Sequence, residues 1–118
     1  MDHLKIESLP GRTEGSRILK LTGPFTLNAV FDFQSITREH VTPVTIIDLS
    51  DVPYMDSGAL GSILGFHASC QREGRKYALA GVSDRIATLF KVSGVAGLLM
   101  SYASVADAEG ALLKAGAE

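Results

Sequence analysis

The sequence predicts an α/β fold in which a mixed sheet of four to five strands packs against about four helices. Short alternating or β-branched segments recur between longer segments whose apolar residues have helical spacing. One short segment, residues 44–49, is almost continuously apolar, which is typical of a strand covered on both faces. With 118 residues, of which 46% are hydrophobic and 20% charged, the chain suits one domain spanning residues 1–118.

The first three predicted elements are a strand pair and a helix. Residues 4–8 alternate between apolar and polar side chains, PGRTEG turns the chain, and residues 18–21 complete a hairpin. Thr26 is expected to cap a helix that runs to about Glu39. The spacing i, i+3, i+4 predicts that the inward face of this helix carries Leu27, Val30 and Phe31.

The remaining predicted elements alternate in type along the chain. They are a strand at 44–49, a helix at 57–73 stopped by Gly74, a strand at 77–80, a helix from Ser83 to Gly94, a short strand at 98–100 and a terminal helix after Ser104. The glycines of the 57–73 helix, Gly58, Gly61 and Gly65, are expected to allow close packing against the sheet. Functional loops of such sheets gather at the carboxyl ends of strands, so the loop after residue 49 is the expected site.

Composition argues against several classes of partner. The net charge of −2 and the pI near 5.9 give no field that would attract nucleic acid or an anionic membrane. No apolar run approaches the ~20 residues of a membrane span, and the N-terminus lacks the features of a signal peptide. Cys70 is the only cysteine, which favours a reducing compartment, the cytoplasm. His67 and Cys70 are predicted to be packing residues, and we expect neither a metal nor a cofactor.

The stretch YMDSGALG places Ser57 between an aspartate and a glycine at the predicted helix start. Serine there is most simply a helix cap, but an exposed hydroxyl at a helix N-terminus can also carry a phosphate, whose charge the helix dipole tolerates. A nucleophilic role is disfavoured because the G-x-S-x-G pattern is absent and His67 lies ~15 Å further along the helix. His3 and His40 could approach Ser57 only through tertiary folding, so we predict that the protein is not an enzyme.

The stretch LSDVPYMDSGALGSILG resembles the signature of bacterial anti-sigma-factor antagonists, a family built on the STAS domain. GVSDRIATLFKVSGV and the order of predicted elements extend this resemblance over almost the whole chain. It implies a protein, monomeric by default, whose Ser57 is phosphorylated by an anti-sigma factor that is also a serine kinase, and is restored by a serine phosphatase. Unphosphorylated antagonist would hold the anti-sigma factor and free a sigma factor for transcription. The alternative is a STAS subunit of another assembly, such as a lipid-transport ATPase or a stress-signalling scaffold.

The resemblance and the local sequence together nominate a partner-binding set. Its members are Asp56, Ser57, Gly58, Met55, Leu60, Phe25 and Thr26. For Phe25, Met55 and Leu60 a place in the core is the alternative, and for Asp56 it is a capping role. The chain departs from the family pattern at Gly58, where a second hydroxyl residue is usual. It also departs after the second strand, where the family often has glycine followed by an acidic residue and this chain has GPFT, with Pro24 and Phe25.

Overall fold

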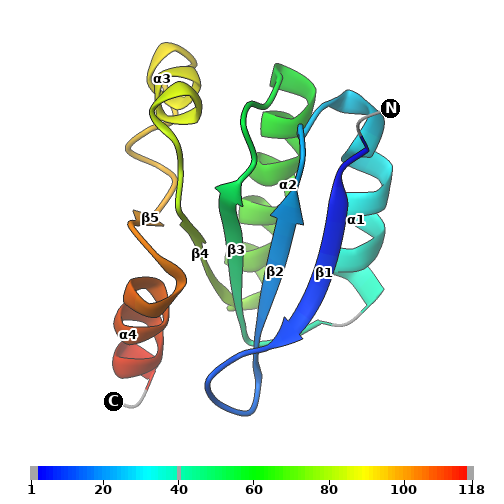
Figure 1. Ribbon diagram of the computed structural model, residues 1–118. Helices are drawn as coiled ribbons and strands as arrows, with labels where there is room; N and C mark the ends of the chain where they lie inside the picture. The colour runs from blue at the N-terminus through cyan, green and yellow to red at the C-terminus, as the bar shows by residue number, and fades with distance from the viewer. Residues whose placement is uncertain (1–2, 40, 117–118) are drawn as a thin grey trace.

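The strands of this protein form one five-stranded sheet in chain order, β1-β2-β3-β4-β5. The computed structural model describes residues 3–39 and 41–116. The strands are β1 (Lys5–Pro10), β2 (Ser16–Thr22), β3 (Val44–Asp51), β4 (Lys76–Ala80) and β5 (Ser101–Tyr102). β1 and β2 form an antiparallel hairpin, whereas all later neighbours are parallel (Figure 1). The mixed sheet confirms the predicted α/β class.

Helices cover both faces of the sheet. They are η1 (Leu27–Ala29), a single 3-10 turn, and the α-helices α1 (Val30–Glu39), α2 (Ser57–Glu73), α3 (Asp84–Val92) and α4 (Val105–Gly116). Buried residues of α1, α2 and α3 belong to one hydrophobic cluster, and Ala108 of α4 belongs to a second. The predicted set of four helices is therefore confirmed. No helix within the described part of the chain has both the length and the apolar character needed to cross a bilayer.

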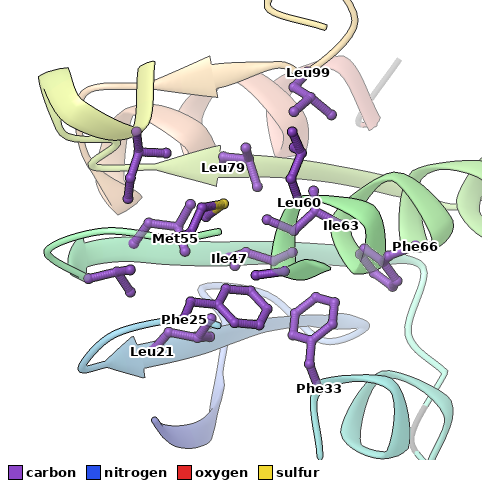
Figure 2. Packing of buried hydrophobic residues seen from close by; sticks show 14 of the residues in the cluster. Leu21, Phe25, Phe33, Ile47, Met55, Leu60, Ile63, Phe66, Leu79 and Leu99 are labelled. Carbon is purple, nitrogen blue, oxygen red and sulfur yellow. The ribbon is translucent and has the colours of Figure 1, made fainter. Parts of the chain in front are cut away.

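β3 is the central strand and is buried on both faces, as its continuous apolar sequence predicts. Because side chains alternate along a strand, Ile47 and Leu49 enter the large cluster, while Ile46 enters the small cluster with Ala108. Figure 2 shows Ile47 lying among Leu21, Ile63 and Leu79 of the large cluster. The loop after β3 therefore starts from the most constrained strand of the fold.

Aromatic rings connect the hairpin side of the core to α2 and β4. The ring centroids of Phe25 and Phe33 are 5.2 Å apart, and those of Phe33 and Phe66 are 6.2 Å apart (Figure 2). The series continues from Phe66 to Tyr77 at 5.5 Å, in an edge-to-face arrangement. Such pairs each add about 0.5–1.5 kcal/mol beyond the burial of their area. This packing fixes α1 and α2 against the sheet.

The first helix begins differently from the prediction. A 3-10 turn precedes α1, and the residues that face the core are Ala29, Phe33 and Thr37. Leu27 and Phe31 are 67% and 77% exposed, so their predicted inward orientation is wrong. The predicted helix segment contains apolar residues that could form either of two helix faces. The packing of Phe33 against Phe25 and Phe66 buries the face that was not predicted.

The last strand also differs from the prediction. Residues 98–100 were expected to form it, but the amides of Leu98 and Leu99 donate to the carbonyl of Val95 and hold this segment in a turn. β5 begins at Ser101, three residues later than predicted, after the Met100 carbonyl has accepted a hydrogen bond from the Leu79 amide. Only Leu99 of the segment is buried, at 5% exposure.

Candidate functional site

The loops that follow β2 and β3 run side by side at the carboxyl edge of the sheet. β2 and β3 are parallel, so the two segments that follow these strands leave the sheet at the same edge. The Gly23 amide donates to the Asp51 carbonyl at 3.0 Å, and the Phe25 amide donates to the Tyr54 carbonyl at 3.1 Å. The Asp56 amide then donates to the Phe25 carbonyl at 3.2 Å. These bonds fix the start of α2 against the start of η1.

Asp56 is the residue that caps α2. Its Oδ1 accepts a hydrogen bond of 2.9 Å from the Ala59 amide, inside the first turn of the helix. Its Oδ2 accepts one of 2.9 Å from the Leu27 amide, at the start of η1. The predicted capping role of Thr26 is therefore wrong, because its side chain makes no cap hydrogen bond and Asp56 satisfies that helix start instead. One carboxylate thus stabilises two helix N-termini.

Ser57 is the first residue of α2, and its side chain is exposed. Because Asp56 supplies the cap, the interpretation of Ser57 as the cap is wrong. Apart from the capping carboxylate of Asp56, the start of α2 carries no acidic residue, and the 17-residue helix directs the positive end of its dipole toward this position. A phosphate on the Ser57 hydroxyl would be both accessible and electrostatically tolerated there.

Gly58 lies directly against Leu27. A Cβ atom at position 58 would be 2.8 Å from Leu27 Cδ1 and 3.3 Å from its Cα. By contrast, a Cβ atom at Gly61 or Gly65 would have no heavy atom within 4 Å. The expectation that these glycines allow α2 to approach the sheet is therefore wrong: Gly58 makes room for η1, and the other two lie on an open face.

Three of the nominated partner contacts lie in the core. Phe25, Met55 and Leu60 are 0%, 7% and 4% exposed, and all three belong to the large hydrophobic cluster (Figure 2). Phe25 and Met55 are brought together by a parallel bridge between the two loops. These side chains are therefore not available as contacts. Asp56, Gly58 and Thr26 are half-buried around Ser57, so the structure does bring this part of the set together.

An apolar surface beside Ser57 was missed by the sequence analysis. We call it the Leu27 surface; it comprises Leu27, Phe31 and Tyr54, with exposures of 67%, 77% and 38%. Leu27 and Tyr54 also line a hollow of about 330 Å³ next to Asp56. Arg85 of α3 lies over the Tyr54 ring, with its guanidinium carbon 5.0 Å from the ring centroid. The i, i+4 spacing of Leu27 and Phe31 indicates an apolar helix face. The prediction placed this face against the core, but it is exposed.

No arrangement for catalysis forms at Ser57 among the residues described. His67 lies further along α2, where its Nδ1 atom is 2.7 Å from the hydroxyl of Tyr77 on β4. Burial raises the pKa of that hydroxyl, so Tyr77 stays protonated. His3 is exposed, and His40 lies outside the described residues. Within residues 3–39 and 41–116, no three potential metal-ligating side chains gather into a cluster.

Asp48 is engaged in the sheet. Its carboxylate accepts bonds from the Ser50 amide and hydroxyl and pairs with Lys20 of β2 at 3.3 Å. Desolvation by itself raises the pKa of Asp48, but the hydrogen bonds from Ser50 and the charge of Lys20 outweigh it and lower the pKa. Asp51 also pairs with Lys20, at 2.8 Å. Both carboxylates therefore join β2 to β3, which agrees with a structural role.

Comparison with known proteins identifies the family. The STAS domain model matches residues 10–108, most of the chain. The anti-sigma-B factor antagonist of Listeria monocytogenes is 38% identical over 53 residues, which cover 45% of this chain and 46% of that protein. The chain therefore matches less than half the length of that relative. The intermembrane phospholipid transport system binding protein MlaB of Escherichia coli is 31% identical over 74 residues, covering 63% of this chain and 76% of that protein.

A solved structure supports the same conclusion at the level of the fold. SpoIIAA, a Bacillus cell fate determinant in its phosphorylated form, superposes with a TM-score of 0.68 at 19% identity, covering 93% of this chain and 99% of that one. The match of the family model, together with a mixed sheet whose central strand leads into the Ser57 helix, shows that the chain belongs to the STAS domain family.

Proposed function

We propose that this protein is an anti-sigma factor antagonist that binds an anti-sigma factor with serine kinase activity and is switched off by phosphorylation at Ser57. In this role it regulates sigma-factor-dependent transcription in the cytoplasm as a binding partner and kinase substrate, without catalytic activity of its own. One observation carries the proposal: Ser57 is exposed at the N-terminus of α2, while the capping bonds are made by Asp56. A serine phosphatase would return the protein to its binding state.

Phosphorylation at this position can act without refolding the chain. The phosphate adds a charge of about −1.5 to −2 at a helix N-terminus that tolerates it. A partner that places a carboxylate or a close-packed surface at Ser57 would then be repelled. A loss of about 2.8 kcal/mol of binding free energy would weaken the complex about a hundredfold. Electrostatics and steric bulk are therefore sufficient for a switch.

The Leu27 surface gives this site an apolar area for a partner. Exposed Leu27 and Phe31 lie one helical turn apart, and Leu27 contacts Gly58 next to the switch residue. Aromatic residues and arginine are enriched at protein interfaces, and this surface offers Phe31 and Tyr54, with Arg85 over the Tyr54 ring. The proposed interface thus consists of Ser57 and its half-buried neighbours together with the Leu27 surface.

The proposal is tested by quantitative affinity capture from the native organism. The baits are the wild-type protein, Ser57→Ala and Ser57→Asp, and captured proteins are identified by mass spectrometry. We expect an anti-sigma factor with a kinase domain to be held by Ser57→Ala and lost with Ser57→Asp. Capture of no such kinase by the alanine bait would contradict the proposal.

A matched pair of surface variants locates the interface. Phe31→Ser should lose the captured kinase, because it removes an exposed apolar side chain one helical turn from Leu27, which contacts Gly58 next to the switch residue. Leu9→Ser should retain it, because Leu9 is 42% exposed but lies on β1, in the edge strand of the sheet. Equal loss in both variants would show that the Leu27 surface is not the contact.

A second function is favoured by the similarity to MlaB, a binding protein of an intermembrane phospholipid transport system. In that case the chain would be a STAS subunit of a transport ATPase. The same capture experiment separates the two functions, because the alanine and aspartate baits would then both bring down transporter subunits.

A further inference from the structure

An arginine-rich cavity lies between α1 and α2, with its arginines at the C-terminal ends of the two helices. Its volume is about 270 Å³, and the two helices that form its walls pack side by side (Figure 1). Arg38 comes from the last turn of α1, Arg72 from the last turn of α2, and Arg75 follows that helix. Along α2 the lining runs from Ser62, ~8 Å from Ser57, to Arg72, ~22 Å from it. The arginines of the cavity are therefore separate from the switch site.

The arginines of the cavity are only partly neutralised. Glu73 is the only carboxylate that lines it within the described residues, and its Oε1 accepts bonds from Arg75 Nε at 2.9 Å and Nη2 at 2.7 Å. Each helix C-terminus adds a partial charge of about −0.5. Together with buried Arg17 alongside, this leaves an excess of about two positive charges in a chain whose net charge is −2.

Arg75 is built into the wall of the cavity. Its side chain is only 9% exposed, and its guanidinium carbon lies 5.5 Å from the centroid of the Phe66 ring, which also lines the cavity. The Nη1 atom of Arg75 is buried and has no hydrogen-bond partner among the described residues. Buried polar groups are nearly always paired, so this donor indicates an acceptor that the chain itself does not supply.

Arg17 of β2 is a second buried arginine, and it is bonded to the end of α1. It is 4% exposed, and its Nη1 and Nη2 donate to the carbonyls of Ile36 and Thr37 at 3.3 and 3.4 Å. Its Nε is also buried without a partner among the residues described. Burial lowers the pKa of Arg17, and the nearby positive charge of Arg75 lowers it further. Two neighbouring buried guanidiniums thus repel one another in this structure.

We propose that this cavity binds a small organic anion carrying a phosphate or carboxylate group. Guanidinium groups recognise both groups through paired hydrogen bonds, and an anion would supply the missing acceptor and reduce the repulsion between Arg17 and Arg75. The volume of about 270 Å³ lies just below the ~300–1,000 Å³ range of ligand pockets, which favours a small ligand. Gly65 leaves the α2 wall open, since a Cβ there would meet no atom within 4 Å.

Amide NMR spectra of the full chain test this proposal by titration with inorganic pyrophosphate and, separately, with succinate. Sodium chloride at matched ionic strength is the reference. We expect saturable shifts confined to the ends of α1 and α2, with a dissociation constant of about 1 mM or tighter for at least one anion. Whichever anion binds identifies the group that is recognised. Absence of saturable shifts with both anions would overturn the proposal, as would shifts centred on Ser57.

Two glycines of α2 provide a matched pair of variants. Gly65→Leu fills the cavity and should weaken binding about tenfold or more, whereas Gly61→Leu, which is equally open but does not line the cavity, should bind like the wild type. If Gly65→Leu fails to fold, Arg38→Gln and Arg72→Gln, both at exposed residues, test the charge instead and should weaken binding to a similar degree. Unchanged affinity in these arginine variants would refute the proposed site.

Discussion

The absence of a side chain at Gly58 is explained by a contact with a residue that is distant in the sequence. The resemblance leads us to expect a second hydroxyl residue at position 58, but the chain has glycine there, and Leu27 occupies the space that a side chain would need. Leu27 is itself held by the bond from its amide to Asp56. The departure at position 58 is therefore matched by an exposed leucine on the neighbouring segment, and both residues border Ser57.

A double-mutant cycle tests this contact. Gly58→Ala adds a methyl group 2.8 Å from Leu27 Cδ1, so its effect on the free energy of unfolding should depend on the residue at position 27. We expect a coupling of about 1 kcal/mol, with Gly58→Ala more favourable in the Leu27→Ala background. Urea denaturation of the four proteins measures it. Additive effects of the two substitutions would mean that the contact is not a constraint.

At the scale of elements, Lys20 joins β2 to β3 through two carboxylates. Its Nζ lies 3.3 Å from Asp48 Oδ2 and 2.8 Å from Asp51 Oδ2. Hydrogen bonds to these two carboxylates raise the pKa of Lys20, with that to Asp51 as the largest cause. The pKa of Asp48 is lowered. The ion pair therefore favours the charged form of both partners.

The stability contribution of this pair should depend on pH. Because the pKa of Asp48 is lowered in the folded state, the contribution is complete above the ordinary aspartate value of about 3.9 and disappears as the pH falls through the folded pKa. Lys20→Met should thus lower the free energy of unfolding by about 1 kcal/mol at neutral pH, and by less in acid. Chemical denaturation from neutral pH to about pH 2 measures the difference. A difference that stays constant over this range would contradict the assignment.

The elements also show what sequence patterns can and cannot determine. β3 and α2 were predicted closely because one is a continuous apolar run and the other is bounded by a capping residue and by Gly74. α1 was placed correctly along the chain but rotated, since a 3-10 start and the packing of Phe33 choose between two possible apolar faces. The position of β5 depends on backbone hydrogen bonds that involve Val95 and Leu79, and local sequence patterns do not predict these bonds.

The same limit applies to the candidate site. The place of Ser57 at a helix start followed from its neighbours, whereas the cap by Asp56 and the exposure of Phe31 depend on how two distant loops meet. Met55 was nominated as a contact because it lies close to Ser57 in the sequence, and Phe25 because its loop was expected near the partner surface. Their bridge draws both side chains into the core, so neither argument predicted burial correctly.

At the scale of the whole molecule, the sheet and its aromatic core form a rigid support for α2. One end of α2 presents Ser57 beside the Leu27 surface, and the other end borders the arginine-rich cavity. Buried contacts link α2 to α1 and to the central strands along its length (Figure 2). A change of charge at Ser57 would therefore alter what the surface binds without altering the fold, which is the central claim of the proposed function.

The most direct test of this claim is the affinity of the captured kinase for the protein carrying phosphoserine at position 57, compared with the unmodified protein. Calorimetric titration measures the dissociation constants, and amide spectra of the two forms report the fold. We predict that phosphorylation weakens binding about a hundredfold while spectral changes stay close to the start of α2. Equal affinity of the two forms, or a loss of affinity accompanied by spectral changes throughout the sheet, would contradict a local electrostatic switch at Ser57.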